Sequence, residues 1–241
     1  MSGVTDSAGV PWAGRTLTSQ PFAGDDGSAD PALAAALAGG DEQAVARALA
    51  AARVLVPVVA VLGEERAPVG PSGLASDKSA AMAVATLVGR DGRKALPVFS
   101  SLAALTAWDG GARPLPAEGA RAALSAVADG CEALVVDPAG PRPAVVRRPV
   151  LWALAQGRPW LPPAQDAEVL EAVEHALAGV GVHVGSGPGL RGDLRVRLGV
   201  RAGLDAGQLS ALLADVQARL AASEVLAERV EGLELEVVEK G

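Results

Sequence analysis

The chain has 241 residues, half of them hydrophobic and only 2% aromatic, and it carries a formal net charge of −7. This length holds one large domain or two ordinary ones, and the core must be built from Ala, Val and Leu rather than from large rings. Nucleic acids and anionic membrane surfaces attract proteins with an excess of positive charge, whereas this chain has a net negative charge. We therefore expect neither as a partner.

The single cysteine, Cys131, excludes an intramolecular disulfide and suits a reducing cytosol. Residues 1–20 lack the basic and apolar regions of a signal peptide, and no uncharged apolar run is long enough to span a membrane. These residues are rich in Gly, Ser and Thr, which predicts a disordered tail. We therefore expect a soluble, cytoplasmic protein.

An N-terminal α/β domain is predicted over residues 21–156. It opens with two helices, because Asp30 is a suitable N-cap followed by Pro31 at the first helical position, and Asp41-Glu42 starts a second helix that ends at residue 52. Three later helices are predicted at residues 102–108, 117–129 and 148–155. In the helix at 117–129, Ala120, Leu124 and Val127 are expected to face inward.

Apolar runs bounded by Gly and Pro predict the strands of this domain, at residues 54–62, 80–89, 94–99, 133–137 and, as a short edge strand, 143–146. Pro57 indicates an edge position or a bulge for the first strand. A long loop is expected over residues 63–79, and Asp91-Gly92 favours a hairpin turn.

Residues 157–164 contain three prolines and are predicted to form a linker. The pattern then restarts as a smaller domain over residues 165–241, a helix–hairpin–helix–strand unit. Its elements are expected at residues 165–177, 180–184, 193–200, 205–222 and 233–238. The predicted fold class is α/β (α+β), with a mixed N-terminal sheet flanked by helices.

The chain lacks the motifs of common catalytic and metal sites. The run from Gly187 to Gly192 matches G-x-G-x-x-G, but a strand rather than a helix is predicted after it, which favours a hairpin loop. His175 and His183 are the only histidines, whereas a zinc site needs three or four ligands. We therefore assign no catalytic residue, no metal and no cofactor.

Polar residues gather where predicted strands end. Lys78 precedes a strand, Ser100 and Ser101 follow another, and Asp137 ends a buried one. Ligands collect outside the carboxyl ends of strands in open α/β sheets, so these four residues are candidates for one ligand-binding crevice. The alternative is ordinary helix capping by a serine and turn formation by Asp137.

Two further groups are candidate surfaces. Trp152 and Trp160 are rare aromatics near the linker, and they would act as interface anchors if exposed, or as packing between domains if buried. Arginines cluster at 147–148 and alternate at 191, 195, 197 and 201, which indicates either a solvated strand face or a binding stripe.

Several segments occur in a familiar order, most clearly Ala95-Leu-Pro-Val-Phe-Ser-Ser101, together with residues 22–31, 53–62, 82–83, 105–108, 112–116 and 134–141. In these segments the chain resembles the SseB family in its actinobacterial form. The resemblance covers residues 21–162 and extends more loosely to the second domain, which looks like an SseB-like C-terminal domain. It implies the same fold and a cytosolic protein, but no reaction, cofactor or catalytic residue.

Three functional hypotheses follow. The first is a non-enzymatic module that senses a metabolite or docks a partner through the crevice near Lys78, Ser100 and Asp137. The second is an enzyme of amino-acid metabolism that uses the same crevice. The third is a structural homo-oligomer joined through the alternating strand at residues 233–238, although its outward glutamates would oppose edge pairing.

Overall fold

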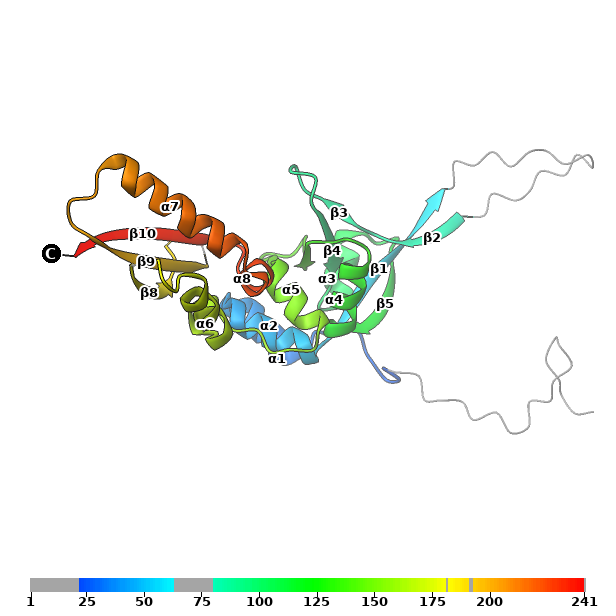
Figure 1. Ribbon diagram of the computed structural model, residues 1–241. Coiled ribbons are helices and arrows are strands. Elements are labelled where there is room, and N and C mark those ends of the chain that lie inside the picture. Colours follow the sequence, from blue (N-terminus) through cyan, green and yellow to red (C-terminus); the bar gives the residue numbers. More distant parts are fainter. Residues whose placement is uncertain (1–21, 63–79, 181, 191–192, 241) are drawn as a thin grey trace, which may run out of the picture.

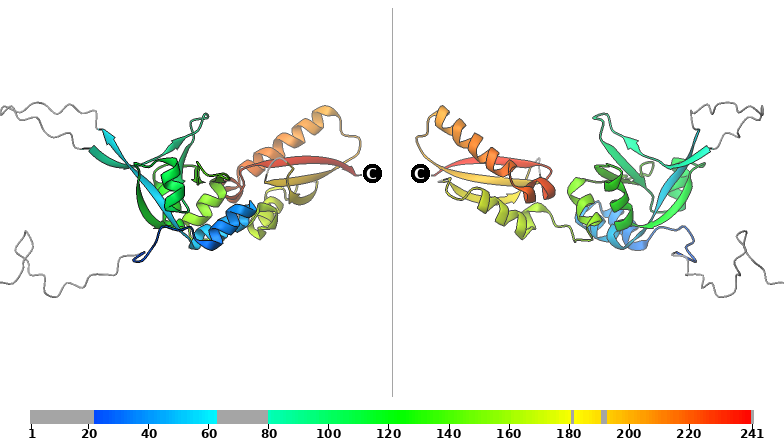
Figure 2. Two further views of the ribbon diagram at one scale, coloured as in Figure 1. Left: turned by 180° about the vertical axis from the view of Figure 1, so that it is seen from behind. Right: turned by 45° about the vertical axis from the view of Figure 1, so that its right-hand side comes forward.

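A computed structural model of the protein describes residues 22–62, 80–180, 182–190 and 193–240. The predicted tail at residues 1–20 and the predicted loop at 63–79 lie outside the described residues. Figures 1 and 2 show two lobes side by side, joined by the segment after α5. We call them the N-lobe, from α1 (Pro31–Gly39) to α5 (Arg148–Ala155), and the C-lobe, from η1 (Pro163–Gln165) to β10 (Leu233–Lys240). Among the described residues, none of the helices combines the length and the hydropathy required to cross a lipid bilayer.

The first two helices of the N-lobe begin where their capping residues predict. Asp30 accepts hydrogen bonds from the backbone N–H groups of Ala32 and Leu33, and it opens α1 (Pro31–Gly39). Asp41 accepts from the N–H of Ala44 and opens α2 (Glu42–Ala51). Both caps are local, so the sequence alone determines them.

Two sheets form the centre of the N-lobe. The first has the order β2-β1-β5 and is antiparallel, with β1 (Arg53–Leu62), β2 (Ala80–Val84) and β5 (Arg113–Glu118). The second has the order β3-β4-β6-β7, with β4 and β6 parallel, and comprises β3 (Leu87–Val88), β4 (Lys94–Val98), β6 (Ala133–Val136) and β7 (Ala144–Val146). A backbone bridge between Leu55 and Phe99 joins the sheets.

Two strand predictions are wrong in detail. Residues 80–89 do not form one strand, because the chain leaves β2 after Val84 and enters the other sheet as β3. The strand with Pro57 is central rather than at an edge. Pro57 lies opposite Pro114 of β5, and its carbonyl accepts a hydrogen bond from the N–H of Ala85. Neither proline has an N–H to donate to the other, and the Pro57 carbonyl takes its hydrogen bond from the β2 side instead.

Helices α2, α4 (Gly119–Ala128) and α5 (Arg148–Ala155) contribute to the main core of the N-lobe, whereas α3 (Leu102–Trp108) packs on a smaller cluster with Leu55 and Phe99. The predicted inward face of α4 is wrong, since Leu124 is 57% exposed and the buried side is formed by Ala122, Ala123 and Ala126. A Cβ at Gly119 would lie 1.9 Å from the carbonyl oxygen of Leu49, so α4 can approach α2 closely only with glycine there.

The C-lobe has its own sheet and its own core. Its sheet has the order β10-β9-β8, with β9 parallel to β10 and antiparallel to β8. The alternate residues of β9 from Leu194 to Val200 pack against Val173 and Val216. Its elements are η1 (Pro163–Gln165), α6 (Ala167–Ala176), β8 (His183–Pro188), β9 (Leu194–Arg201), α7 (Ala206–Ala221), α8 (Glu224–Arg229) and β10 (Leu233–Lys240).

This arrangement confirms the α+β class and the helix–hairpin–helix–strand order of the second unit. The predicted strand at 180–184 lies too early, because β8 begins at His183 and includes Gly187. Strand β9 follows the glycine run, and no helix begins there in the described residues. The nucleotide interpretation of G-x-G-x-x-G therefore lacks its required helix N-terminus.

Candidate functional site

Ser100 and Asp137 meet at the carboxyl ends of the parallel strands β4 and β6, as the strand order predicts. Asp137 Oδ1 accepts a hydrogen bond from the Ser100 N–H at 2.8 Å, and Oδ2 accepts from Ser100 Oγ at 2.6 Å. Ser100 is only 6% exposed, and Asp137 has a φ of 50°, in the left-handed region. Both oxygens of the carboxylate are thus engaged within the protein.

Ser101 has a separate role. Its Oγ accepts a hydrogen bond from the N–H of Ala104 at 3.1 Å, which caps α3. Lys78, the fourth residue of the predicted crevice, lies outside the described residues. The described part of the crevice therefore consists of one helix cap and one closed serine–aspartate pair.

Arg53 completes this polar cluster, and the sequence analysis does not identify it as a site residue. Its guanidinium donates to the carbonyl oxygens of Ser100 and Ser28 and to Asp25 Oδ1, the last at 2.8 Å. These contacts tie the loop before α1 to the end of β4. A partly buried hydrogen-bonded network of this kind helps to fix loop geometry.

Chemically, the cluster offers little to a substrate. Ser100 donates to a carboxylate, and His175 lies on α6 of the C-lobe rather than beside the cluster. Among the described residues, no group of three or more His, Cys, Asp and Glu side chains is placed to hold a metal ion.

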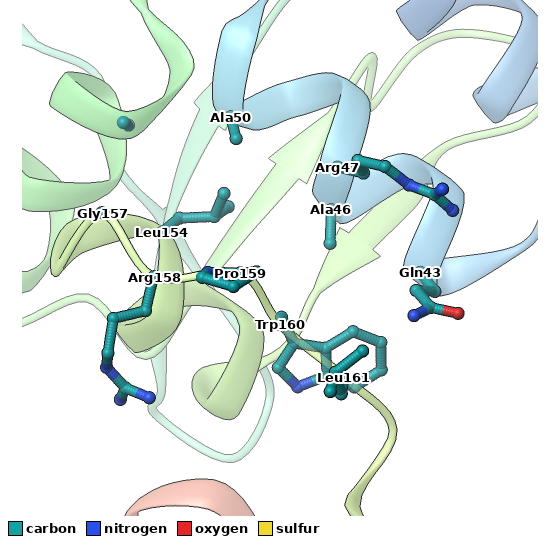
Figure 3. A pocket seen from close by; sticks show the side chains of 11 residues that line it. Gln43, Ala46, Arg47, Ala50, Leu154, Gly157, Arg158, Pro159, Trp160 and Leu161 are labelled. Atoms are coloured by element: carbon teal, nitrogen blue, oxygen red, sulfur yellow. The ribbon is translucent and has the colours of Figure 1, made fainter. Parts of the chain in front are cut away.

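A larger concave site lies beside Trp160, where α2 and α4 face the segment that follows α5 (Figure 3). We call this cavity, of about 480 Å³, the Trp160 groove. It is lined by Gln43, Ala46, Arg47, Ala50, Ala120, Leu154, Gly157, Arg158, Pro159, Trp160 and Leu161. The volume falls in the range typical of small-molecule sites.

Short side chains create the space in the groove. Ala46 and Ala50 on α2 and Ala120 on α4 line the cavity with methyl groups only, and Trp160 lines it from the segment after α5. The Trp160 ring packs against the N-lobe core, and its Nε1 is buried with no hydrogen-bond partner among the described residues. Trp152, the other predicted anchor, is partly exposed on α5.

The groove has a polar end on α2. Gln43 and Arg47 are four residues apart, so they lie on the same face of the helix. Figure 3 shows both side chains at the same end of the groove, away from Arg158. Neither side chain forms a hydrogen bond or an ion pair with another described residue. The groove therefore combines an apolar floor with an available cation.

In the comparison with known proteins, residues 30–153 match the family model of the SseB protein N-terminal domain. The chain belongs to the SseB family. No curated protein and no solved structure gives a significant match. Within this SseB-family chain, the matched region supplies the α2 and α4 sides of the groove, whereas residues 154–161 follow directly after it.

Arginines connect the two lobes of the SseB-family chain. Arg147 donates to both carboxylate oxygens of Glu42 on α2 and to Asp193, which precedes β9. These hydrogen bonds, first that of Glu42, raise the pKa of Arg147 above its ordinary value despite partial burial. Arg158 donates to Glu228 on α8 at 2.5 Å and to Gln156.

The alternating arginines of β9 are not a free stripe. Arg197 donates to Glu236 at 2.7 Å, and Arg195 lies within ion-pair distance of Glu234 and Glu236 on the neighbouring β10. The hydrogen bond from Arg197 lowers the pKa of Glu236. Arg191 lies outside the described residues. The cross-strand carboxylates thus neutralise the two arginines in the middle of the strand.

Sequence reasoning misses the groove residues Gln43, Arg47 and Arg158. The available signal is an alanine stripe on α2, at Ala46 and Ala50, beside an unpaired cation. To recognise the groove from this signal, one must also know where residues 157–161 lie relative to α2. No local sequence pattern provides that position.

Proposed function

We propose that this SseB-family protein is a non-enzymatic binding module that holds a small organic molecule in the Trp160 groove. The observation that carries the proposal is the groove itself, a cavity of about 480 Å³ with an alanine floor and a polar end at Gln43 and Arg47. Small-molecule sites combine a mostly apolar lining with a few placed polar groups, and this lining has that composition.

The enzyme alternative is weaker for a chemical reason. It would need Asp137 to accept a proton while both of its oxygens accept hydrogen bonds from Ser100. Each oxygen keeps a second lone pair, but Ser100 is only 6% exposed, so a substrate has little access to the pair. The pair is better suited to holding the ends of β4 and β6 together.

We also infer that residues 21–156 and 165–241 form two domains joined by a linker at 157–164, and that the second is an SseB-like C-terminal domain. The separate hydrophobic clusters of the two lobes support this division. The resemblance of the chain's segments, such as residues 95–101, supports an actinobacterial type, and the single cysteine favours the cytoplasm.

The test is a ligand-detected NMR screen of small organic molecules against the full chain. Ala50 is exposed and lines the groove, so Ala50→Phe fills the cavity without entering the core. Ala51→Phe, at the next position of the same helix, is the matched control. We expect hits that bind the wild type and Ala51→Phe and that are lost in Ala50→Phe. Hits that persist in Ala50→Phe, or a screen without hits, would contradict the proposal.

A further inference from the structure

We propose that the ligand of the Trp160 groove is an amphipathic monocarboxylate, with an apolar body on the alanine floor and its carboxylate at Arg47. This inference rests on the proposed function and adds the chemical class of the ligand. It follows from the distribution of charge and apolar surface around the cavity.

The apolar floor of the groove favours a ligand with an apolar body. Ala46 and Leu154 are buried, and Ala50 and Pro159 add apolar surface at the sides. A hydrocarbon or ring that covers these atoms leaves water and gains free energy in proportion to the apolar area removed. Few hydrogen-bonding groups lie along this part of the groove, so a strongly polar body would lose hydration without compensation.

The charge of the lining selects an anion. Its charged side chains are two arginines, and none of the described residues that line it is acidic. The chain as a whole carries 28 acidic and 21 basic residues, so a cavity wall with arginine alone differs in sign from the average surface. A cationic ligand would meet the like charge of Arg47, which has no ion pair among the described residues.

The geometry of the polar end favours a single carboxylate. Arg47 has no ion pair among the described residues, and its planar guanidinium can donate two parallel hydrogen bonds to a carboxylate. The amide of Gln43 supplies a further donor on the same helix face. Arg158, the second arginine, is already engaged by Glu228 and Gln156, so one cation is available for one negative charge.

The experiment compares a matched pair of probes, 4-phenylbutyrate and 4-phenylbutanamide, by isothermal titration calorimetry of the full chain. The two probes share a body and differ in charge. We expect the acid to bind about tenfold or more tightly than the amide, because charge-assisted hydrogen bonds are the stronger ones. Arg47→Gln should remove this difference, because it weakens binding of the acid far more than binding of the amide. Arg113→Gln, an exposed arginine on β5, is the control that should retain the difference.

The outcomes separate this inference from the proposed function. Equal binding of acid and amide that Ala50→Phe abolishes would overturn the carboxylate class and keep the groove as a binding site. Binding of both probes that survives Ala50→Phe would overturn the groove itself. If neither this acid nor straight-chain acids of graded length bind, the carboxylate class is overturned, and the neutral hits of the NMR screen decide the proposed function.

Discussion

Arg158 donates a hydrogen bond to Glu228 across the junction of the two lobes, at 2.5 Å, while the same residue lines the Trp160 groove. The pair connects the groove to α8 of the C-lobe. An anion at Arg47 and the carboxylate of Glu228 therefore compete indirectly, because the charge of Glu228 lowers the positive potential that Arg158 adds to the groove.

This competition predicts that Glu228→Gln strengthens binding of 4-phenylbutyrate. The substitution removes the charge that neutralises Arg158, and a partly exposed ion pair of this kind is worth about 1 kcal/mol or less, so the expected gain is roughly two- to fivefold. Calorimetry at low and high salt measures the effect, which salt should reduce. Glu224→Gln on the same helix serves as the control, and an unchanged or weaker affinity for the Glu228 variant would refute the competition.

The Ser100–Asp137 pair should be structural. Asp137→Ala leaves the buried N–H and Oγ of Ser100 without their acceptor, so we expect a loss of about 1–3 kcal/mol in the free energy of unfolding. Asp137→Asn should lose less, because an amide oxygen can still accept and Asn tolerates the left-handed backbone found here. Urea denaturation provides both values. A stable Asp137→Ala protein would instead favour a role for this carboxylate in chemistry.

The buried thiol gives a pH-dependence. Burial raises the pKa of Cys131, because the thiolate is less well solvated inside the protein. The folded state thus retains the thiol proton to higher pH than the unfolded state. This contribution to stability is complete below the pKa of a free thiol, about 8.5, and is lost as the pH rises through the folded value.

Denaturation curves across alkaline pH test this expectation. The wild type should lose stability above about pH 8.5 more steeply than Cys131→Ala, which lacks the titrating group. Iodoacetamide should also modify the thiol more slowly in the native protein than in urea. Parallel pH profiles for the two proteins would show that burial of this thiol is not coupled to folding.

The ion pair between Arg147 and Asp193 should couple the lobes energetically. The Asp193 side chain is 9% exposed and that of Arg147 is 35% exposed, so solvent screens the pair only in part. A double-mutant cycle with Arg147→Gln and Asp193→Asn should give a coupling of about 1 kcal/mol that decreases with added salt. A coupling near zero would mean that the junction depends on other contacts.

The parts of the structure that the sequence predicts well depend on local signals. Asp30 and Asp41 begin their helices, and the order of strands brings Ser100 and Asp137 to one edge of a sheet. Ser100 and Asp137 are therefore neighbours, and a ligand-binding crevice at this place stays a prediction. The sequence does not predict whether the polar groups of Ser100 and Asp137 are free to bind a ligand. That depends on hydrogen bonds between segments that are distant in the chain.

The wrong predictions have two causes, the amino-acid composition of the elements and the separation in the chain of the residues that meet in the fold. Helix α4 is rich in alanine, so the hydrophobic pattern cannot distinguish its buried side, and it places Leu124 inward when that residue is exposed. Strand β5 is not predicted, because its two prolines are unfavourable in a strand. The Trp160 groove joins α2, α4 and residues 154–161, which only the tertiary structure brings together.

The most direct test of a carboxylate-binding groove is an NMR titration of the full chain with 4-phenylbutyrate that follows the tryptophan indole N–H signals. Trp160 lines the groove, whereas Trp108 packs against Phe99 at the other hydrophobic cluster of the N-lobe. We expect the Trp160 signal to shift with saturation and the Trp108 signal to stay in place. An unshifted Trp160 signal at a saturating concentration of the acid would contradict the account.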